Sequence, residues 1–282
     1  MAAWAVAVLS ASAADAGRFR PAPKPLAGAQ ANQVEGRQAL ADFRAAGIRG
    51  TYWLQFELQV LPRRGEERSL KGQLYGTRAA EGPLTRLALA ADPQRRGPSV
   101  RWLIQSGAAP AAWAWTADEP ARVRALAGAD VLQPVAGTDL TLFDLQMPFL
   151  YWEDFVYEGL GKVRNRPAHS FLLYPPAELA AAHPELTGVR VALDTQFGAL
   201  VQAEWLGPKG DPIKTFTVLD VKKVGEQWLV KSLDLRNHVT RDKTRLTVNA
   251  AAFDFTPATD AFRPEGLLTE PAGPDAASVL RF

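Results

Sequence analysis

Three carboxylates in one short stretch, Asp144, Glu153 and Asp154, are the residues best suited to acid–base chemistry. Two carboxylates that converge in a cleft can serve as general acid and general base, as they do in glycan-cleaving enzymes. The surrounding residues 135–155 are unusually rich in apolar side chains, so the simpler interpretation is that the carboxylates mark the polar edges of apolar helices and face water. We favour this interpretation and expect no catalytic residue among them.

The other reactive side chains form no recognisable site. His169, His183 and His238 lie far apart in the sequence, have no metal-ligand spacing, and are more typical of surface or hydrogen-bonded histidines. The chain has no cysteine, which excludes disulfides, thiol catalysis and an acylated lipobox cysteine. It also lacks a nucleophile elbow, a P-loop and a dinucleotide-binding fingerprint. We therefore expect a protein that is not an enzyme and needs no metal or cofactor.

Composition narrows the range of partners. The 282 residues are 47% hydrophobic, which is enough for a sizeable core, and 32 basic against 30 acidic residues give a formal net charge of +2. The overall electrostatic potential therefore does not favour binding to nucleic acid or to an anionic membrane, and we expect no nucleic-acid partner. Eight tryptophans need either a core or an apolar ligand surface to lie against.

The N-terminal sequence MAAWAVAVLSASAADAG has an apolar stretch that ends in small residues, as in a secretory signal peptide, although a basic n-region is missing. We predict a signal peptide at residues 1–16, with an Ala-rich apolar tail as the alternative, and a flexible linker rich in Pro, Ala and Gly at residues 17–34. No later segment approaches the ~20 apolar residues that a membrane span needs. The mature protein is expected to be exported and soluble.

Two periodicities dominate the remaining sequence. Residues 35–46 place Leu40, Phe43 and Ala46 on one side, which predicts an amphipathic helix. From residue 52 onward the apolar residues alternate with polar ones, as in strands with one face in water. The predicted strands are residues 52–60, 70–76, 84–90, 100–105, 113–115, 156–163, 170–174, 189–193, 200–205, 215–222, 228–235 and 244–248. We predict a mainly β (α+β) fold of about 10–11 antiparallel strands that curls into a barrel or half-barrel with helices covering its concave face, because a flat sheet does not hold so many strands comfortably.

The stretch at residues 135–155 fits neither strand pattern. Asp139 or Thr141 can cap a first helix, and Pro148 can end it and begin a second one. We therefore predict a two-part helical lid at residues 137–155, hinged near Pro148. The lid residues facing the sheet are predicted to be Leu142, Phe143, Leu145, Met147 and Phe149. The wall of a ligand cavity beneath them is predicted to comprise Tyr52, Leu54, Phe56, Leu58, Leu87, Leu89, Trp102 and Ile104.

The order of these elements resembles the outer-membrane lipoprotein-sorting proteins of the periplasmic Lol carrier superfamily, which also includes a lipid-sensing regulator. The resemblance extends from Glu35 to Leu268, so a carrier-like domain at 35–268 would precede a C-terminal tail at 269–282. The stretches that carry it are EGRQALADFRAAG before GTYWLQFELQV, the hairpins through RLALAA and VRWLIQSG, AGTDLTLFDLQMPFLYWEDFVYEG, HSFLLYPP, GALVQAEWLGPKGDPIKTFTVLDV, TRLTV and DFTPATDAFRPEGL.

The resemblance implies a periplasmic protein with a strongly curved antiparallel half-barrel closed by helices. It also implies a cavity for the acyl chains of lipoproteins or another lipid, with delivery partners at the inner and outer membranes. It also implies that an arginine on an early strand holds the lid shut; Arg86 and Arg101 both lie on early strands, and neither is assigned this role. The alternatives are a lipid-sensing envelope-stress regulator of the same fold and a structural envelope protein with a dry core. A solid core around the lid residues, with no adjoining cavity, would contradict the carrier hypothesis.

Overall fold

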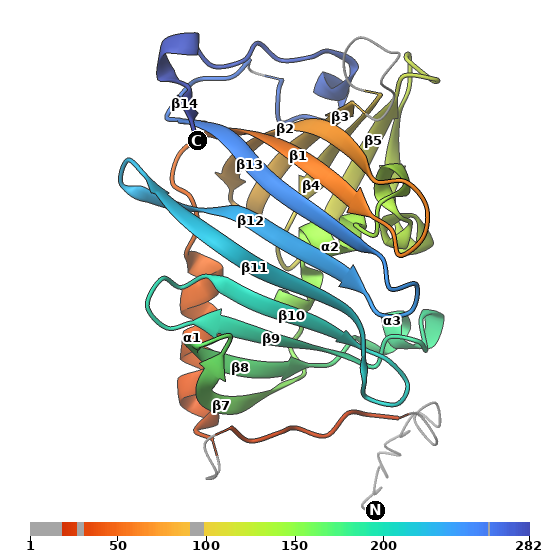
Figure 1. Ribbon diagram of the computed structural model, residues 1–282, viewed down its shortest axis with the longest axis vertical. Helices are drawn as coiled ribbons and strands as arrows, with labels where there is room; N and C mark the ends of the chain where they lie inside the picture. Colours follow the sequence, from red (N-terminus) through yellow and green to blue (C-terminus); the bar gives the residue numbers. More distant parts are fainter. Residues whose placement is uncertain (1–18, 27–30, 91–98, 259) are drawn as a thin grey trace, which may run out of the picture.

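One antiparallel sheet forms most of the protein (Figure 1). The computed structural model describes residues 19–26, 31–90, 99–258 and 260–282, so the predicted signal peptide at 1–16 lies outside the described residues. The sheet has 14 strands and is not closed into a barrel. The strands are β1 (Tyr52–Leu61), β2 (Arg68–Ala79), β3 (Gly82–Ala90), β4 (Val100–Gln105), β5 (Ala111–Thr116), β6 (Val123–Leu126), β7 (Phe155–Val163), β8 (Arg166–Leu173), β9 (Gly188–Asp194), β10 (Leu200–Leu206), β11 (Pro212–Val224), β12 (Gln227–Asn237), β13 (Lys243–Phe253) and β14 (Leu280–Arg281).

The predicted fold class, mainly β with a curved antiparallel sheet, agrees with this architecture, but the predicted count of about 10–11 strands is too low. The predicted ranges themselves number twelve and match every strand except β6 and β14, which have four and two residues and are too short to show an alternating pattern. Strand order also differs from a single meander. The order is β6-β5-β4-β3-β2-β1-β13-β12-β11-β10-β9-β8-β7, so two meanders join where β1 pairs with β13.

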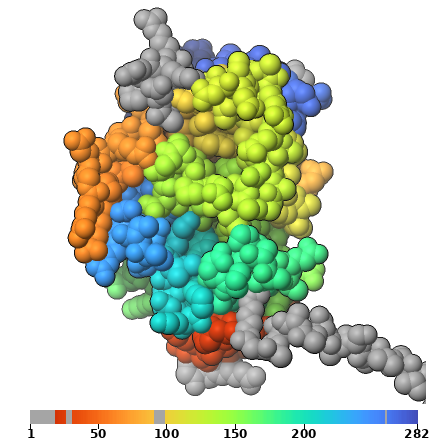
Figure 2. Space-filling view, turned by 90° about the vertical axis from the view of Figure 1, so that its right-hand side faces the viewer, coloured from red at the N-terminus to blue at the C-terminus, as the bar shows by residue number. Residues whose placement is uncertain are grey.

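This topology places β6 and β7, which follow each other in the sequence, at opposite edges of the sheet. The chain between them, residues 127–154, must therefore cross from one edge to the other, and we call it the crossover segment. It contains the 3₁₀ helices η2 (Gly128–Leu132), η3 (Val135–Gly137) and η4 (Pro148–Tyr151) and the helix α2 (Leu142–Gln146). Figure 2 shows the chain from β5 into this segment, in yellow-green, covering the middle of one face between the β1–β2 turn and the region of α3 (Ala177–Ala182).

Close packing across the sheet requires glycine at two positions of β2. A Cβ atom at Gly72 would lie 2.2 Å from the ring of Phe56, and one at Gly76 would lie 2.0 Å from the ring of Tyr52. The aromatic rings of β1 therefore lie over backbone that has no side chain. The β1–β13 pair also has a register shift between Gln55 and Phe56, an irregularity that bends strands and increases their twist.

The helix α1 (Gln33–Ala45) lies on the concave face, behind β8 to β11 in the view of Figure 1. It begins where Asn32 accepts hydrogen bonds from the backbone of Val34 and Glu35, close to the predicted start at residue 35. Leu40 is buried in the core, and Gly36 allows the helix to approach Tyr157 of β7. The predicted amphipathic helix is thus present, with its apolar side against the sheet.

The described part of the expected linker, residues 19–26, makes specific contacts with the domain. The guanidinium of Arg20 lies 3.6 Å from the ring centroid of Tyr174 and forms an ion pair with Asp154. The backbone N–H of Leu26 donates to the carbonyl oxygen of Glu158 at 2.8 Å, on the free edge of β7. This part of the chain therefore lies along the domain at the β7 edge.

The side chain of Gln33 completes the cover of this edge. Its amide oxygen accepts from the backbone N–H of Tyr157 at 2.8 Å, and its amide nitrogen donates to the carbonyl oxygen of the same residue at 2.8 Å. The carboxamide thus occupies the two hydrogen-bonding groups that a further strand would use. Within the described residues, no helix has the length and apolar character needed to cross a membrane.

Candidate functional site

The crossover segment and the inner face of the sheet share one hydrophobic cluster. Six of the predicted wall residues are buried members of this cluster: Phe56, Leu58, Leu87, Leu89, Trp102 and Ile104. Leu54 is partly buried and packs against the cluster. Of the predicted lid residues, Leu142, Phe143 and Phe149 are buried in the cluster, while Leu145 and Met147 pack against it. Tyr52 lies half-buried beside Gly76. The alternation along the early strands therefore indicated the correct face of the sheet.

The helical part of the crossover segment is kinked at the position expected. Thr141, one of the two candidate caps, accepts a hydrogen bond from the backbone of Asp144, whose side chain accepts from the backbone of Thr141, which is a capping box. The helix α2 ends at Met147, which has a left-handed φ of 48°, and Pro148 begins η4. Two short helical pieces therefore meet at a residue in a conformation that side chains rarely adopt.

Asp144 does not face water, and the prediction that all three carboxylates do so is wrong for this residue. Its side chain is 1% exposed, and its Oδ2 atom lies 2.8 Å from the Nζ atom of Lys214 on β11. Its Oδ1 atom is buried and has no hydrogen-bond partner in the described part of the protein. Glu153 is exposed, and Asp154 pairs with Arg20 outside the pocket, so the three carboxylates have separate surroundings. They do not form the convergent pair that glycan cleavage requires.

Further polar contacts fix the crossover segment to both halves of the sheet. Asp139, the other candidate cap, accepts a hydrogen bond from the side-chain amide of Asn237 on β12 at 3.1 Å. The side-chain amide of Gln146 donates to the carbonyl oxygen of Ala111 on β5 at 2.9 Å. Arg68 on β2 donates to the carbonyl oxygens of the η3 turn. Together with Lys214 on β11, these residues hold the crossover segment against the concave face.

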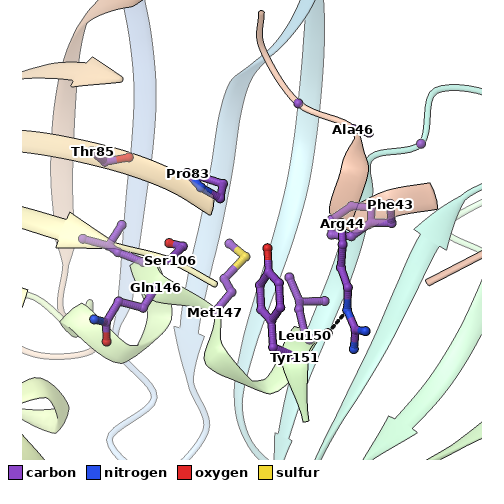
Figure 3. Close-up of a pocket in the computed structure, with 13 residues that line it drawn as sticks. Phe43, Arg44, Ala46, Pro83, Thr85, Ser106, Gln146, Met147, Leu150 and Tyr151 are labelled. Atoms are coloured by element: carbon purple, nitrogen blue, oxygen red, sulfur yellow. Dashed lines mark hydrogen bonds between the residues drawn. The ribbon is translucent and has the colours of Figure 1, made fainter. Parts of the chain in front are cut away.

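A pocket of about 250 Å³ adjoins the crossover segment (Figure 3). It lies between the end of α1, the ends of β3 and β4, and α2 with η4. Its lining residues are Phe43, Arg44, Ala46, Gly47, Pro83, Thr85, Ser106, Leu145, Gln146, Met147, Leu150, Tyr151 and Gly198. Only Leu145 and Met147 of the predicted site residues line it. The predicted wall residues lie elsewhere, mostly in the packed core, so the open space is displaced toward α1 from the position expected.

Arg44 is the charged residue of this pocket. Its Nε atom donates to the carbonyl oxygen of Leu150 in η4 at 2.6 Å, and its guanidinium lies 5.3 Å from the ring centroid of Tyr151. Burial lowers the pKa of Arg44 below its ordinary value, while the nearby Tyr151 acts in the opposite direction. Sequence reasoning missed Arg44 because a basic residue in the last turn of a helix is expected for the helix dipole alone.

The two early-strand arginines lie on the other face of the sheet. Arg86 is 1% exposed and donates to the carbonyl oxygens of Ala261 at 3.2 Å and Gly266 at 2.8 Å. Arg101 donates to the carbonyl oxygen of Leu267 at 2.8 Å and lies 3.9 Å from the ring centroid of Trp115. Neither makes a hydrogen bond to the crossover segment among the described residues. Both arginines bind carbonyl oxygens of residues 260–282, which we call the C-terminal segment and which include η5 (Glu265–Leu268).

The C-terminal segment continues along this outer face beyond the region of the arginines. It contains η6 (Ala276–Ser278), and β14 pairs with β13. Tyr75 donates a hydrogen bond to the carbonyl oxygen of Pro271 at 3.4 Å. The residues expected to form a C-terminal tail therefore pack against the domain, and the last of them, Phe282, lies against the hydrophobic cluster of the inner face.

The three histidines have ordinary neighbours. His169 lies 2.7 Å from the hydroxyl of Tyr157, and His238 lies 2.8 Å from that of Thr215. His183 lies 3.0 Å from the carboxylate of Glu185. In the described part of the chain, no group of three or more His, Asp or Glu side chains is arranged to hold a metal ion.

A family model described as "Uncharacterized protein" matches residues 102–268, which is more than half of the chain. Comparison with curated proteins finds no match. Solved structures share the fold. A domain from Vibrio parahaemolyticus, described as belonging to an outer membrane lipoprotein-sorting protein, has a TM-score of 0.73 at 18% identity and covers 84% of this chain and 100% of its own. A DUF1329 family protein from Desulfovibrio piger has a TM-score of 0.71 at 12% identity and covers 83% and 98%. A LolA superfamily protein from Nitrosomonas europaea has a TM-score of 0.57 at 10% identity and covers 79% and 96%.

Proposed function

Because the chain belongs to this family of uncharacterized proteins and has the fold of the LolA superfamily, we propose that it is a periplasmic carrier that holds the acyl chains of a lipid or lipoprotein between its sheet and its crossover segment. The carrier serves the sorting of lipoproteins to the outer membrane. The predicted signal peptide at residues 1–16 supports export to the periplasm.

One observation carries the proposal: an apolar pocket opens where the crossover segment meets α1. The crossover segment contains only short helical pieces, and polar contacts such as the ion pair of Asp144 with Lys214 fix it to the sheet. Apolar side chains on its inner side, such as Met147 and Leu150, line the pocket. A structural protein with a dry, filled core would have no need of open space at this position.

Binding then depends on the apolar area that leaves water. Each methylene group buried contributes roughly 0.8 kcal/mol, so an acyl chain that enters between sheet and crossover segment is held without any covalent step. The kink at Met147 and Pro148 allows η4 to move relative to α2 as the chain enters. Release occurs when a membrane-bound partner offers the acyl chain a better apolar surface.

The partners proposed are lipoprotein acyl chains or another lipid, together with delivery partners at the inner and outer membranes. The lipoprotein-sorting description of the Vibrio parahaemolyticus domain supports this choice of cargo. A regulator that senses lipid would bind the same kind of molecule in the same pocket and would differ in its protein partner.

Native mass spectrometry of the protein purified from its own cell envelope tests the proposal. A retained lipid of defined mass is expected, and it should be lost in Ser106→Phe, which places an aromatic ring in the pocket. Thr240→Phe, on an exposed turn between β12 and β13, is the matched control and should retain the lipid. A protein that arrives free of lipid and fails to bind a fluorescent fatty acid would contradict the carrier role.

A further inference from the structure

The pocket combines an apolar interior with a single type of charge. Its lining residues include Arg44 but no aspartate or glutamate. Its uncharged polar groups are the side chains of Thr85, Ser106, Gln146 and Tyr151. A ligand in this pocket would therefore meet a cation and neutral hydrogen-bonding groups, and no acidic side chain from the lining.

Arg44 also has unused hydrogen-bonding capacity. Only its Nε atom has an acceptor within the described residues, the carbonyl oxygen of Leu150, and no carboxylate there lies within ion-pair distance. Figure 3 shows its guanidinium extending beyond Leu150, beside the ring of Tyr151. The two terminal nitrogens of a guanidinium can bind a carboxylate or phosphate in a bidentate manner.

Among the described residues, the other half-buried arginines have a carboxylate partner, and the more deeply buried Arg86 and Arg101 each have at least two carbonyl acceptors. Arg245 on β13 binds Asp234 through two nitrogens, at 2.6 and 2.9 Å, and Arg190 on β9 binds Glu158 at 2.9 Å. Burial of a cation is costly unless an anion or hydrogen-bond acceptors compensate for the lost water. Arg44 thus differs from both groups, because within the described residues it has no carboxylate partner and a single carbonyl acceptor, and it lies at an open pocket.

A second arginine adds positive charge nearby. Arg78 on β2 donates to the carbonyl oxygens of Arg44 and Ala46, the latter at 2.9 Å, and so its guanidinium lies at the end of α1. These bonds tie the last turn of α1 to β2 and fix the backbone that carries Arg44. The pocket mouth is therefore both basic and positioned by the sheet.

We propose that the pocket selects an acidic amphiphile with a single acyl chain, whose carboxylate or phosphate head binds Arg44 and whose tail lies along Leu145, Met147 and Leu150. The inference rests on the proposed function, because it specifies which lipids the carrier accepts. A volume of about 250 Å³ restricts the occupant of the closed pocket to part of one chain. Tyr151 contributes its ring and hydroxyl beside the head group.

Displacement of the neutral fluorescent probe N-phenyl-1-naphthylamine tests the proposal on the full-length protein at pH 7.5. The competitors are decanoate, decyl phosphate, decanol and decyltrimethylammonium, which share one chain length and differ in the head. We expect decanoate or decyl phosphate to bind at least about tenfold more tightly than decanol, because a hydrogen bond to a charged group typically raises affinity by about tenfold or more. The comparison of the two anions distinguishes a carboxylate source from a phosphate source.

Variants assign the preference to Arg44. Arg44→Gln should weaken binding of the preferred anion to the level of decanol and leave decanol unchanged, whereas Arg44→Lys should keep the preference. Arg122→Gln, at an exposed position between β5 and β6, is the control and should behave as the wild type. Thermal unfolding of each variant confirms that the comparison is made on folded protein.

The outcomes separate the two proposals. If decanol binds as tightly as both anions, the carrier function stands and the selection by charge is wrong. If Arg44→Gln stays folded and keeps the full preference, the assignment to Arg44 is wrong. If none of the four amphiphiles displaces the probe, the proposed function itself fails, and the inference fails with it.

Discussion

Lys214 on β11 places its ammonium nitrogen 2.8 Å from the Oδ2 atom of Asp144 in the crossover segment. The two residues are far apart in the sequence, and the pair joins the crossover segment to the second meander of the sheet. The side chain of Asp144 is 1% exposed and that of Lys214 is 17% exposed. The pair is therefore screened much less by water than an ordinary surface ion pair.

Lys214→Met should reduce the free energy of unfolding by about 3 kcal/mol, because it leaves the buried carboxylate of Asp144 without its cation. The double variant Asp144→Leu/Lys214→Met should recover much of this loss, since neither charge then remains. Urea denaturation measures both values. Lys223→Met, which removes an exposed pair with Glu226, is the control and should change the free energy of unfolding by less than about 0.5 kcal/mol. Equal losses in Lys214→Met and Lys223→Met would contradict the prediction.

Gly72→Ala should destabilise the protein by about 1–3 kcal/mol, because the new Cβ atom would lie 2.2 Å from the ring of Phe56. A smaller side chain in the double variant Gly72→Ala/Phe56→Leu should relieve part of this loss, giving a positive coupling in a double-mutant cycle. Gly273→Ala has open space around its Cβ position and provides the control. Strictly additive effects of the two substitutions would show that the ring moves aside without cost.

Arg86→Met should loosen the C-terminal segment and leave the pocket intact, because the carbonyl oxygens of Ala261 and Gly266 lose a charged donor. Burial lowers the pKa of Arg86 to about 10, with the positive charge of Arg101 adding to the effect, so the group is still protonated at neutral pH. Amide hydrogen exchange in residues 260–269 should become roughly tenfold faster. Arg124→Met is the control, and unchanged exchange in both variants would argue against this anchoring role.

The ion pair of Asp234 should make stability fall in acid. Burial alone would raise the pKa of Asp234, but hydrogen bonds and charges from Arg245 and Lys243 outweigh it and lower the pKa. A carboxyl group with a lowered folded pKa stabilises the protein above its unfolded pKa of about 4, and this contribution is lost as the pH falls through the folded pKa. Urea denaturation of the wild type and Asp234→Asn between pH 6 and 2.5 should show a smaller acid-dependent loss in the variant. Parallel curves would contradict the assignment.

Local patterns in the sequence predict the longer strands, though not the short β6 and β14, and they predict the side of the sheet that faces the core. Leu87 and Leu89 alternate with Arg86, and the structure places the leucines inside and the arginine outside. The same patterns could not show that β1 pairs with β13, because pairing between distant strands depends on the whole topology. The sequence therefore predicts the pairing of neighbouring strands within each meander, and not the pair that joins the two meanders.

The candidate site was harder to predict for the same reason. The sequence predicts that Asp144 faces water because it stands at the polar edge of an apolar helix, and its partner Lys214 lies far away on β11. The pocket combines Arg44 of α1 with Thr85 and Ser106 at the ends of β3 and β4, three segments with no shared local signal. The contact of Leu142, Phe143 and Phe149 with the core could be predicted because the crowding of apolar residues is visible within a single stretch.

The crossover segment has one further consequence, which follows from its two attachment points. Its ends continue directly into β6 and β7, the two outermost strands of an open sheet. A chain of fixed length, at most about 3.6 Å per residue, therefore sets the greatest distance by which these edges can separate. A bulky cargo cannot be accommodated simply by flattening the sheet, and room for it must come from lifting the middle of the segment while both ends stay in place.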